Sequence, residues 1–98
     1  MAKISWTSEA ERWLKDIYDY IAADNQGAAV RVIAGIYEKT QALAQFPEIG
    51  YRHDKHQNDE VRILLYGHYR IAYLVRADGD VDILGVFHGA LDMQRYLL

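Results

Sequence analysis

The chain has 98 residues, of which 11 are basic and 14 acidic, so its formal net charge is −3 at pH 7, and 51% of its residues are hydrophobic. This composition fits one small globular domain over residues 1–98 and excludes a multidomain enzyme, a collagen-like chain and a disordered tail. The absence of cysteine excludes a disulfide framework, a thiolate zinc site and a cysteine nucleophile. The first residues have neither the apolar core of a signal peptide nor a membrane span, so we expect a cytoplasmic protein.

The N-terminal half is predicted to form a short strand and a helical hairpin. Residues 3–6 alternate polar and apolar side chains, which is typical of a strand. Ser8 is a candidate helix N-cap, and Glu11 would complete a capping box with it. Apolar residues then recur at three- and four-residue steps, and the spacing predicts a helix that ends near residue 23.

A second helix is predicted over residues 29–44, before Pro47, which disfavours helical geometry in the residue that precedes it. Gly35 inside this helix costs up to about 1 kcal/mol relative to alanine, and its simplest explanation is the close approach of another element. On the exposed side of the first helix, opposite charges four residues apart predict two ion pairs: Glu11 with Lys15 and Arg12 with Asp16.

After Pro47 the hydrophobic period changes from helical to alternating. Residues 52–60 are polar and predict a loop, with at most an irregular edge strand at Tyr51. Three strands are predicted over residues 61–66, 69–76 and 81–88, joined by short hairpin turns. The resulting β-αα-βββ order predicts an α+β fold in which the helical hairpin packs on one face of a small, mostly antiparallel twisted sheet.

Two helices can cover one face of such a sheet, so the other face is expected to be open to water or to a partner. Strand periodicity places Tyr69, Ile71, Tyr73 and Val75 beneath the helices. Residues 61–77 contain three arginines and no acidic side chain, which predicts a basic stripe on the uncovered face. The residues that we expect on this face are Arg62, Tyr66, Arg70, Arg76 and His88.

Two interpretations of these residues stay open. Exposed arginines are ordinary on a solvated sheet face, but a group of them also suits an anionic partner, either acidic side chains or nucleic-acid phosphates. His88 is either a hydrogen-bonded structural residue or a proton donor held near a reacting group. The segment 53–56 has metal-binding residue types, but a loop lacks the spacing of a rigid site, so no metal or cofactor is expected.

Several motifs, in their order along the chain, resemble the RelE/ParE superfamily of toxins from type II toxin–antitoxin (plasmid stabilisation) modules. The resemblance covers essentially the whole chain. It implies a small cytoplasmic toxin that is inactive while a cognate antitoxin is bound in a hetero-oligomer. The motifs are Trp13-Leu14, Tyr20-Ile21-Ala22, Ala28-Ala29, Pro47 with Gly50, Tyr69-Arg70-Ile71-Ala72-Tyr73 and His88-Gly89-Ala90-Leu91-Asp92.

The superfamily has two branches. RelE-like members cleave mRNA on the ribosome without a metal, and ParE-like members inhibit growth by acting on DNA gyrase. For a ribonuclease, the resemblance implies catalytic roles for Arg62, Arg70, His88 and Tyr96. However, Ala90 and Leu91 stand where the nucleases, and many gyrase-type members too, place an arginine. For a nuclease, loss of one transition-state charge contact costs on the order of 10² to 10³ in rate unless Arg95 substitutes.

This gap and the net charge of −3 favour the ParE-like branch, which binds its target rather than acting as an enzyme on it. An mRNA-cleaving toxin stays open as an alternative, as does an inactive homologue that serves antitoxin binding and operon co-repression. An acidic or amphipathic antitoxin segment would cover the basic stripe or lie along the helical hairpin. The predicted partner-binding residues are Arg62, Tyr66, Arg70, Arg76, His88 and Arg95.

Overall fold

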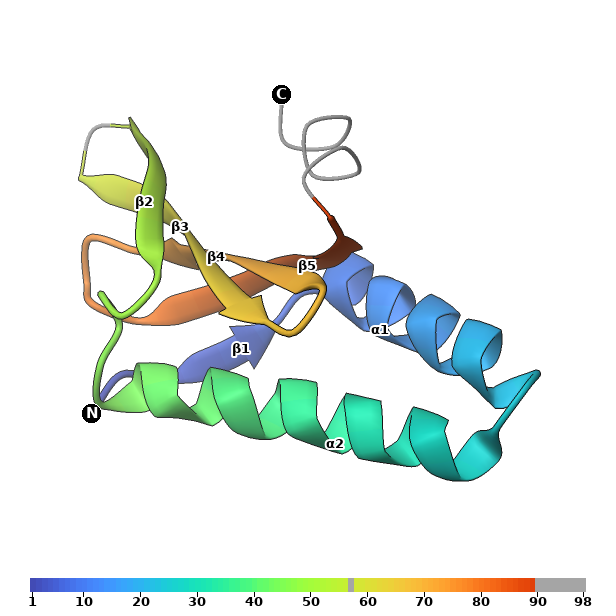
Figure 1. Ribbon diagram of the computed structural model, residues 1–98. Coiled ribbons are helices and arrows are strands. Elements are labelled where there is room, and N and C mark those ends of the chain that lie inside the picture. Colours follow the sequence, from blue (N-terminus) through green and yellow to red (C-terminus); the bar gives the residue numbers. More distant parts are fainter. Residues whose placement is uncertain (57, 90–98) are drawn as a thin grey trace.

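The computed structural model describes residues 1–56 and 58–89, and in it two helices pack on one face of a five-stranded sheet (Figure 1). This architecture confirms the predicted α+β fold. No helix in these residues has the length and apolarity needed to cross a membrane. The elements are β1 (Ile4–Trp6), α1 (Ser8–Ala22), α2 (Gln26–Gln41), the short 3₁₀ helix η1 (Ala42–Ala44), β2 (Tyr51–His56), β3 (Asp59–Tyr66), β4 (Tyr69–Val75) and β5 (Val81–His88).

The start of α1 is capped by Thr7, so the predicted Ser8 cap and its capping box are wrong. The Thr7 hydroxyl accepts a 3.1 Å hydrogen bond from the amide of Ala10 and donates a 2.8 Å hydrogen bond to the carbonyl of Ile83 in β5. One side chain therefore satisfies an exposed helix amide and ties the helix start to the sheet.

Helix α2 begins earlier than predicted, because Asn25 caps it. The Asn25 side chain accepts a 3.0 Å hydrogen bond from the amide of Ala28. The close approach predicted at Gly35 is confirmed: a Cβ atom at this position would overlap the hydroxyl of Tyr66 and lie 2.6 Å from its Cζ. The missing side chain lets a strand tyrosine reach the backbone of α2.

The strands follow the order β1-β5-β4-β3-β2. β1 runs parallel to β5, and the other neighbours are antiparallel. β2 is a six-residue edge strand with one bulge between Arg52 and Asp54, where the sequence predicts a loop with at most an irregular edge strand at Tyr51. The sequence of this segment lacks the apolar alternation that indicates a strand, but its backbone is held by pairing with β3.

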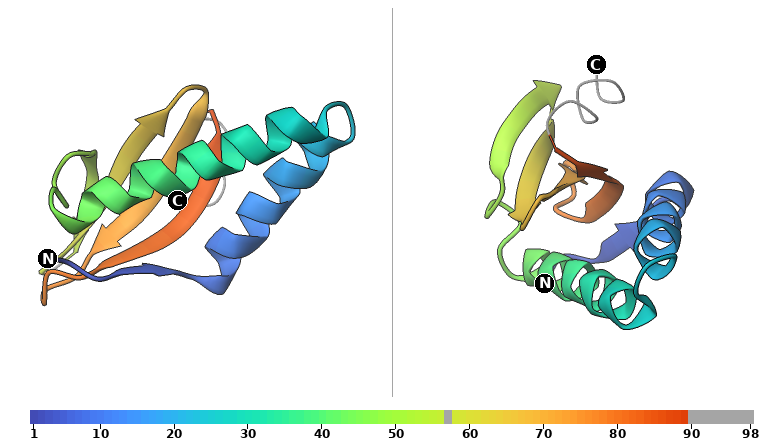
Figure 2. Two further views of the ribbon diagram at one scale, coloured as in Figure 1. Left: turned by 90° about the horizontal axis from the view of Figure 1, so that it is seen from below. Right: turned by 45° about the vertical axis from the view of Figure 1, so that its right-hand side comes forward.

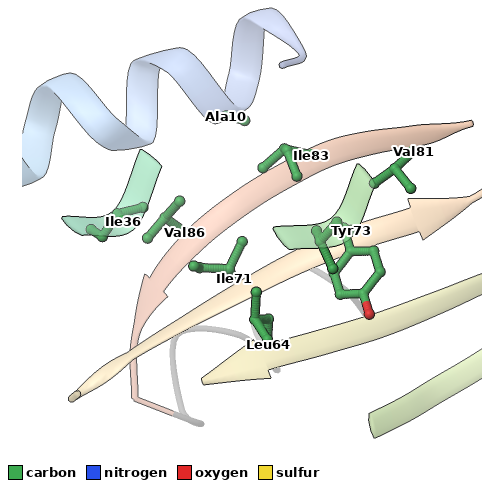
Figure 3. Close-up of a cluster of buried hydrophobic side chains, with 9 residues drawn as sticks. Ala10, Ile36, Leu64, Ile71, Tyr73, Val81, Ile83 and Val86 are labelled. Atoms are coloured by element: carbon green, nitrogen blue, oxygen red, sulfur yellow. The ribbon is translucent and has the colours of Figure 1, made fainter. Parts of the chain in front are cut away.

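The core lies between the helices and the sheet (Figure 3). Ile71 and Tyr73 of β4 are fully buried there with Ile36 of α2, which confirms the face predicted for β4. The helical hairpin lies on one side of the sheet, and the turn between its helices extends beyond the strands (Figure 2). The opposite face of the sheet is called the helix-free face below.

Candidate partner-binding surfaces

Strand register decides which face each predicted site residue occupies. Directly opposite residues of an antiparallel pair point to the same face of the sheet. Arg62 lies opposite Tyr73, and Tyr66 lies opposite Tyr69, so both face the helices. Their prediction on the uncovered face is wrong. A signal was available, because the two-residue turn at Gly67 and His68 pairs Tyr66 directly with Tyr69.

His88 also lies on the helix side of the sheet, against the prediction. It pairs with Tyr69, and the two rings meet edge to face with centroids 5.3 Å apart. The physical reason is a bulge in β5: Ile83 lies opposite Tyr73 and Gly85 opposite Ala72, which leaves Leu84 as an extra residue. The extra residue reverses the alternation for the end of the strand.

The guanidinium of Arg62 makes its hydrogen bonds within the protein. Its Nε donates a 2.9 Å hydrogen bond to Glu60, and its Nη1 donates to the carbonyls of Gly50 at 2.6 Å and of Glu48 at 3.1 Å. Only 15% of its side chain is exposed. The guanidinium therefore fixes the turn that precedes β2.

Tyr73 holds the same turn from beneath. Its hydroxyl accepts a 2.9 Å hydrogen bond from the amide of Gly50 and donates a 2.8 Å hydrogen bond to the carbonyl of Pro47. Burial raises the pKa of this hydroxyl, and the hydrogen bond from Gly50 opposes the rise. The turn is thus bound by two side chains from the covered face.

Arg76 lies among three carboxylates after the end of β4. Its Nε is 3.4 Å from Asp78, its Nη2 is 3.3 Å from Asp80 and its Nη1 is 3.6 Å from Asp82. The charges of Asp78 and then Asp82 raise the pKa of Arg76. These contacts neutralise Arg76, which is removed from Arg70 by six residues of extended chain, roughly 20 Å. The predicted basic stripe therefore does not form.

Arg70 does lie on the helix-free face, as predicted. It is opposite Leu65 and Phe87, and its Nη1 donates a 3.1 Å hydrogen bond to the hydroxyl of Tyr51. Leu65 is 52% exposed and Tyr51 44%. Arg70 thus lies among apolar and aromatic side chains. The buried cluster on this face consists of Ile63, Ala72 and Phe87, and Trp13 of α1 packs against Phe87 with ring centroids 4.8 Å apart.

Two predicted site residues, Arg95 and Tyr96, lie outside the described residues. Within residues 1–56 and 58–89, no group of three histidine or acidic side chains is placed to hold a metal ion.

The sequence did not identify the residues of a groove between the two helices. The groove has a volume of about 570 Å³. At one wall Trp6 stacks on Tyr37, with ring centroids 6.3 Å apart, and Tyr37 is 52% exposed. We call this the hairpin groove; its residues are Trp6, Glu11, Leu14, Lys15, Tyr18, Asp19, Ile33 and Tyr37. The spacing of Leu14 to Tyr18 and of Ile33 to Tyr37, four residues on each helix, is the signal that could have revealed it.

Comparisons with known proteins agree with this fold. The family described as "ParE toxin of type II toxin-antitoxin system, parDE" matches residues 4–93. A Sinorhizobium fredii protein designated as a candidate toxin, Y4kP, is 38% identical over 86 residues, which are 88% of this chain and 86% of that protein. A chain of the "chromosomal ParDE TA system from P. aeruginosa" has a TM-score of 0.70 and 24% sequence identity, and the match covers 92% of this chain and 98% of that chain; it is similar in fold. The chain therefore belongs to the ParE toxin family of type II toxin–antitoxin systems.

Proposed function

We propose that this ParE-family toxin acts in the cytoplasm on DNA gyrase, without cleaving RNA, and that a cognate antitoxin neutralises it in a hetero-oligomer. Membership of the ParE family supports the choice of gyrase. The observation that carries the proposal is that Arg62 and Arg70, two members of the predicted ribonuclease set, lie on opposite faces of the sheet. Two side chains on opposite faces do not act together on one phosphate.

The contacts of Arg62 also oppose a role in RNA cleavage. Its guanidinium already binds Glu60 and two backbone carbonyls. Turning it toward an RNA phosphate would leave these acceptors without their donor, at a cost of several kcal/mol for a largely buried pair. An interior role therefore fits Arg62 better than a catalytic one.

Two assays with the purified toxin test the target. DNA supercoiling by gyrase is expected to stop, and mRNA on translating ribosomes is expected to stay intact. Codon-linked cuts in the mRNA that disappear in Arg70→Ala would overturn the proposal in favour of a ribonuclease. Unchanged growth after induction without antitoxin would also overturn it, in favour of an inactive homologue.

We place the antitoxin in the hairpin groove. The groove has an apolar floor with Leu14 and Ile33, and its rim carries both charge signs, including the 2.7 Å ion pair of Lys15 with Asp19. An amphipathic helix fits such a site, because its apolar face fills the floor and its flanks meet the charged rim. Tyr37 stands at the wall as a partly exposed aromatic anchor, the residue type that dominates protein interfaces.

The variant Tyr37→Asp tests this placement. We expect it to weaken antitoxin binding about a hundredfold, because it puts a carboxylate against an apolar contact. Phe46→Asp is the matched control: Phe46 is 60% exposed and lies outside the groove. Affinities measured by calorimetry should separate the two variants, and an equal effect of both would exclude the groove as the binding site.

A further inference from the structure

A second cleft lies between α1 and the adjoining ends of β4 and β5. Its volume is about 380 Å³, and its walls include three aromatic side chains: Trp13 and Tyr20 from α1, and Tyr69 from β4. Ile17 adds apolar surface, and the fully buried Val86 lies behind it. We call it the aromatic cleft. It shares no residue with the hairpin groove and lies on the helix side of the sheet, so neither surface discussed above accounts for it.

Tyr20 and Tyr69 both line this cleft. Burial raises the pKa of the Tyr69 hydroxyl, and the nearby Tyr20 hydroxyl adds to the rise. His88 places its ring against Tyr69 at a centroid distance of 5.3 Å. Tyr20 itself is 84% exposed, so it forms a rim that an entering group can contact without disturbing the core.

Asp16 supplies an acidic group to the same cleft. The predicted ion pairs of Arg12 with Asp16 and of Glu11 with Lys15 do not form; Lys15 instead pairs with Asp19 at 2.7 Å. The Asp16 carboxylate has no hydrogen bond or ion pair with any residue in the described parts of the chain. Its acceptor capacity is free beside three aromatic rings.

We propose that the aromatic cleft receives an arginine side chain from a partner polypeptide. A guanidinium is planar and weakly hydrated, so it stacks on aromatic faces while it donates two hydrogen bonds to a carboxylate. The methylene groups of the same side chain would contact Ile17. A purely apolar occupant would strip water from Asp16 without offering a donor, and that desolvation is unfavourable.

Neighbouring charges are compatible with a cationic occupant. Glu9 and Arg12 line a small hollow together with Trp13 and Asp16, and their charges are opposite. Within the described lining of the cleft, the one basic side chain is that of His88. The proposal concerns a different surface from the proposed gyrase and antitoxin functions and does not depend on either.

A pair of short peptides tests the proposal directly on the full chain. N-acetyl-glycyl-arginyl-glycinamide is titrated and followed by NMR at the Trp13 indole and the Tyr69 ring. Its partner peptide carries citrulline, which has the shape of arginine without the charge. We expect saturable shifts with the arginine peptide and about tenfold weaker binding of the citrulline peptide. Equal binding of the two, or no shifts at these rings, would overturn the proposal.

Two variants locate the site. Asp16→Asn is expected to weaken the arginine peptide about tenfold, because it removes the charged acceptor. Asp19→Asn is the matched control, since Asp19 lies on the same exposed helix but is paired with Lys15. Tyr20→Leu should weaken binding by several-fold through loss of cation–π contact, and its high exposure preserves the fold, which circular dichroism verifies. Equal losses in Asp16→Asn and Asp19→Asn would show general attraction by an acidic surface and refute a specific site.

Discussion

Arg62 and Arg70 occupy neighbouring strands of one sheet and illustrate the difference between its two faces. Arg62 faces the helices and gives its donors to Glu60 and to two turn carbonyls, whereas Arg70 faces away and contacts one tyrosine hydroxyl. The same residue type thus stabilises a turn on one face and is open to further contacts on the other. The difference follows from strand register and from the acceptors within reach, and not from the residue type.

Among the variants that test this comparison, Arg62→Ala is expected to have the largest effect on stability. It should lower the free energy of unfolding by about 3 kcal/mol, because it leaves Glu60 and the turn carbonyls without a donor. Urea denaturation measures the change. Arg52→Ala is the control: Arg52 approaches the same Glu60 at 4.0 Å, but 56% of its side chain is exposed, so its removal should cost less than about 0.5 kcal/mol. Equal losses of stability in the two variants would show that the hydrogen bonds of Arg62 do not stabilise the turn.

Gly35→Ala should have the second-largest effect. It should lower the free energy of unfolding by about 2 kcal/mol, because the added Cβ overlaps Tyr66 on the covered face. Intrinsic helix propensity alone predicts the opposite sign. Gly27→Ala in the same helix has room, since a Cβ there would lie 3.4 Å from its nearest neighbour, an atom of Asn25, and it should be neutral or stabilising. Thermal melting of both variants gives the sign of each stability change. A higher melting temperature for Gly35→Ala would contradict the close approach of Tyr66 to α2.

Tyr73→Phe should cost about 1.5 kcal/mol, since it orphans the Gly50 amide and the Pro47 carbonyl. Tyr73 also predicts a pH dependence. Its folded pKa is raised above the ordinary 10.0, so its contribution is complete below that pH and is lost as the pH rises through the folded pKa, because the unfolded chain ionises first. Denaturation at several alkaline pH values should show a steeper decline in wild type than in Tyr73→Phe; parallel curves would be inconsistent with this role.

Arg70→Ala is expected to have the smallest effect on stability, within about 0.5 kcal/mol, because its hydrogen bond lies on an exposed surface. This variant sharpens the comparison with Arg62: one arginine is needed for the fold and the other is dispensable for it. Urea denaturation measures the change. A loss of stability comparable to that of Arg62→Ala would show that the two arginines do not differ in their contribution to the fold.

The order of the elements apart from β2 and η1, and the covered face of β4, were predictable, because both follow from hydrophobic period. The strand over Ile71 and Tyr73 alternates cleanly, and Gly35 signalled the approach of another element. Each of these features is local in sequence, so the pattern of neighbouring residues was enough to find it.

The face of His88 was not predictable in the same way. It depends on one extra residue in β5, and a bulge leaves no clear mark in the pattern of apolar residues. Strand β2 was missed because edge pairing satisfies its backbone while its side chains stay polar. The two clefts depend on how α1 lies against α2 and against β5, and this geometry arises from tertiary packing rather than from local spacing.

The edge strand β2 has a further consequence for contacts between copies of the chain. An edge strand presents free backbone donors and acceptors that invite uncontrolled pairing between copies. β2 counters this with a bulge and with a run of charged and imidazole side chains, Arg52-His53-Asp54-Lys55. These features discourage edge-to-edge aggregation, so a polar stretch that resembled a loop serves to keep the folded chain apart from its own copies.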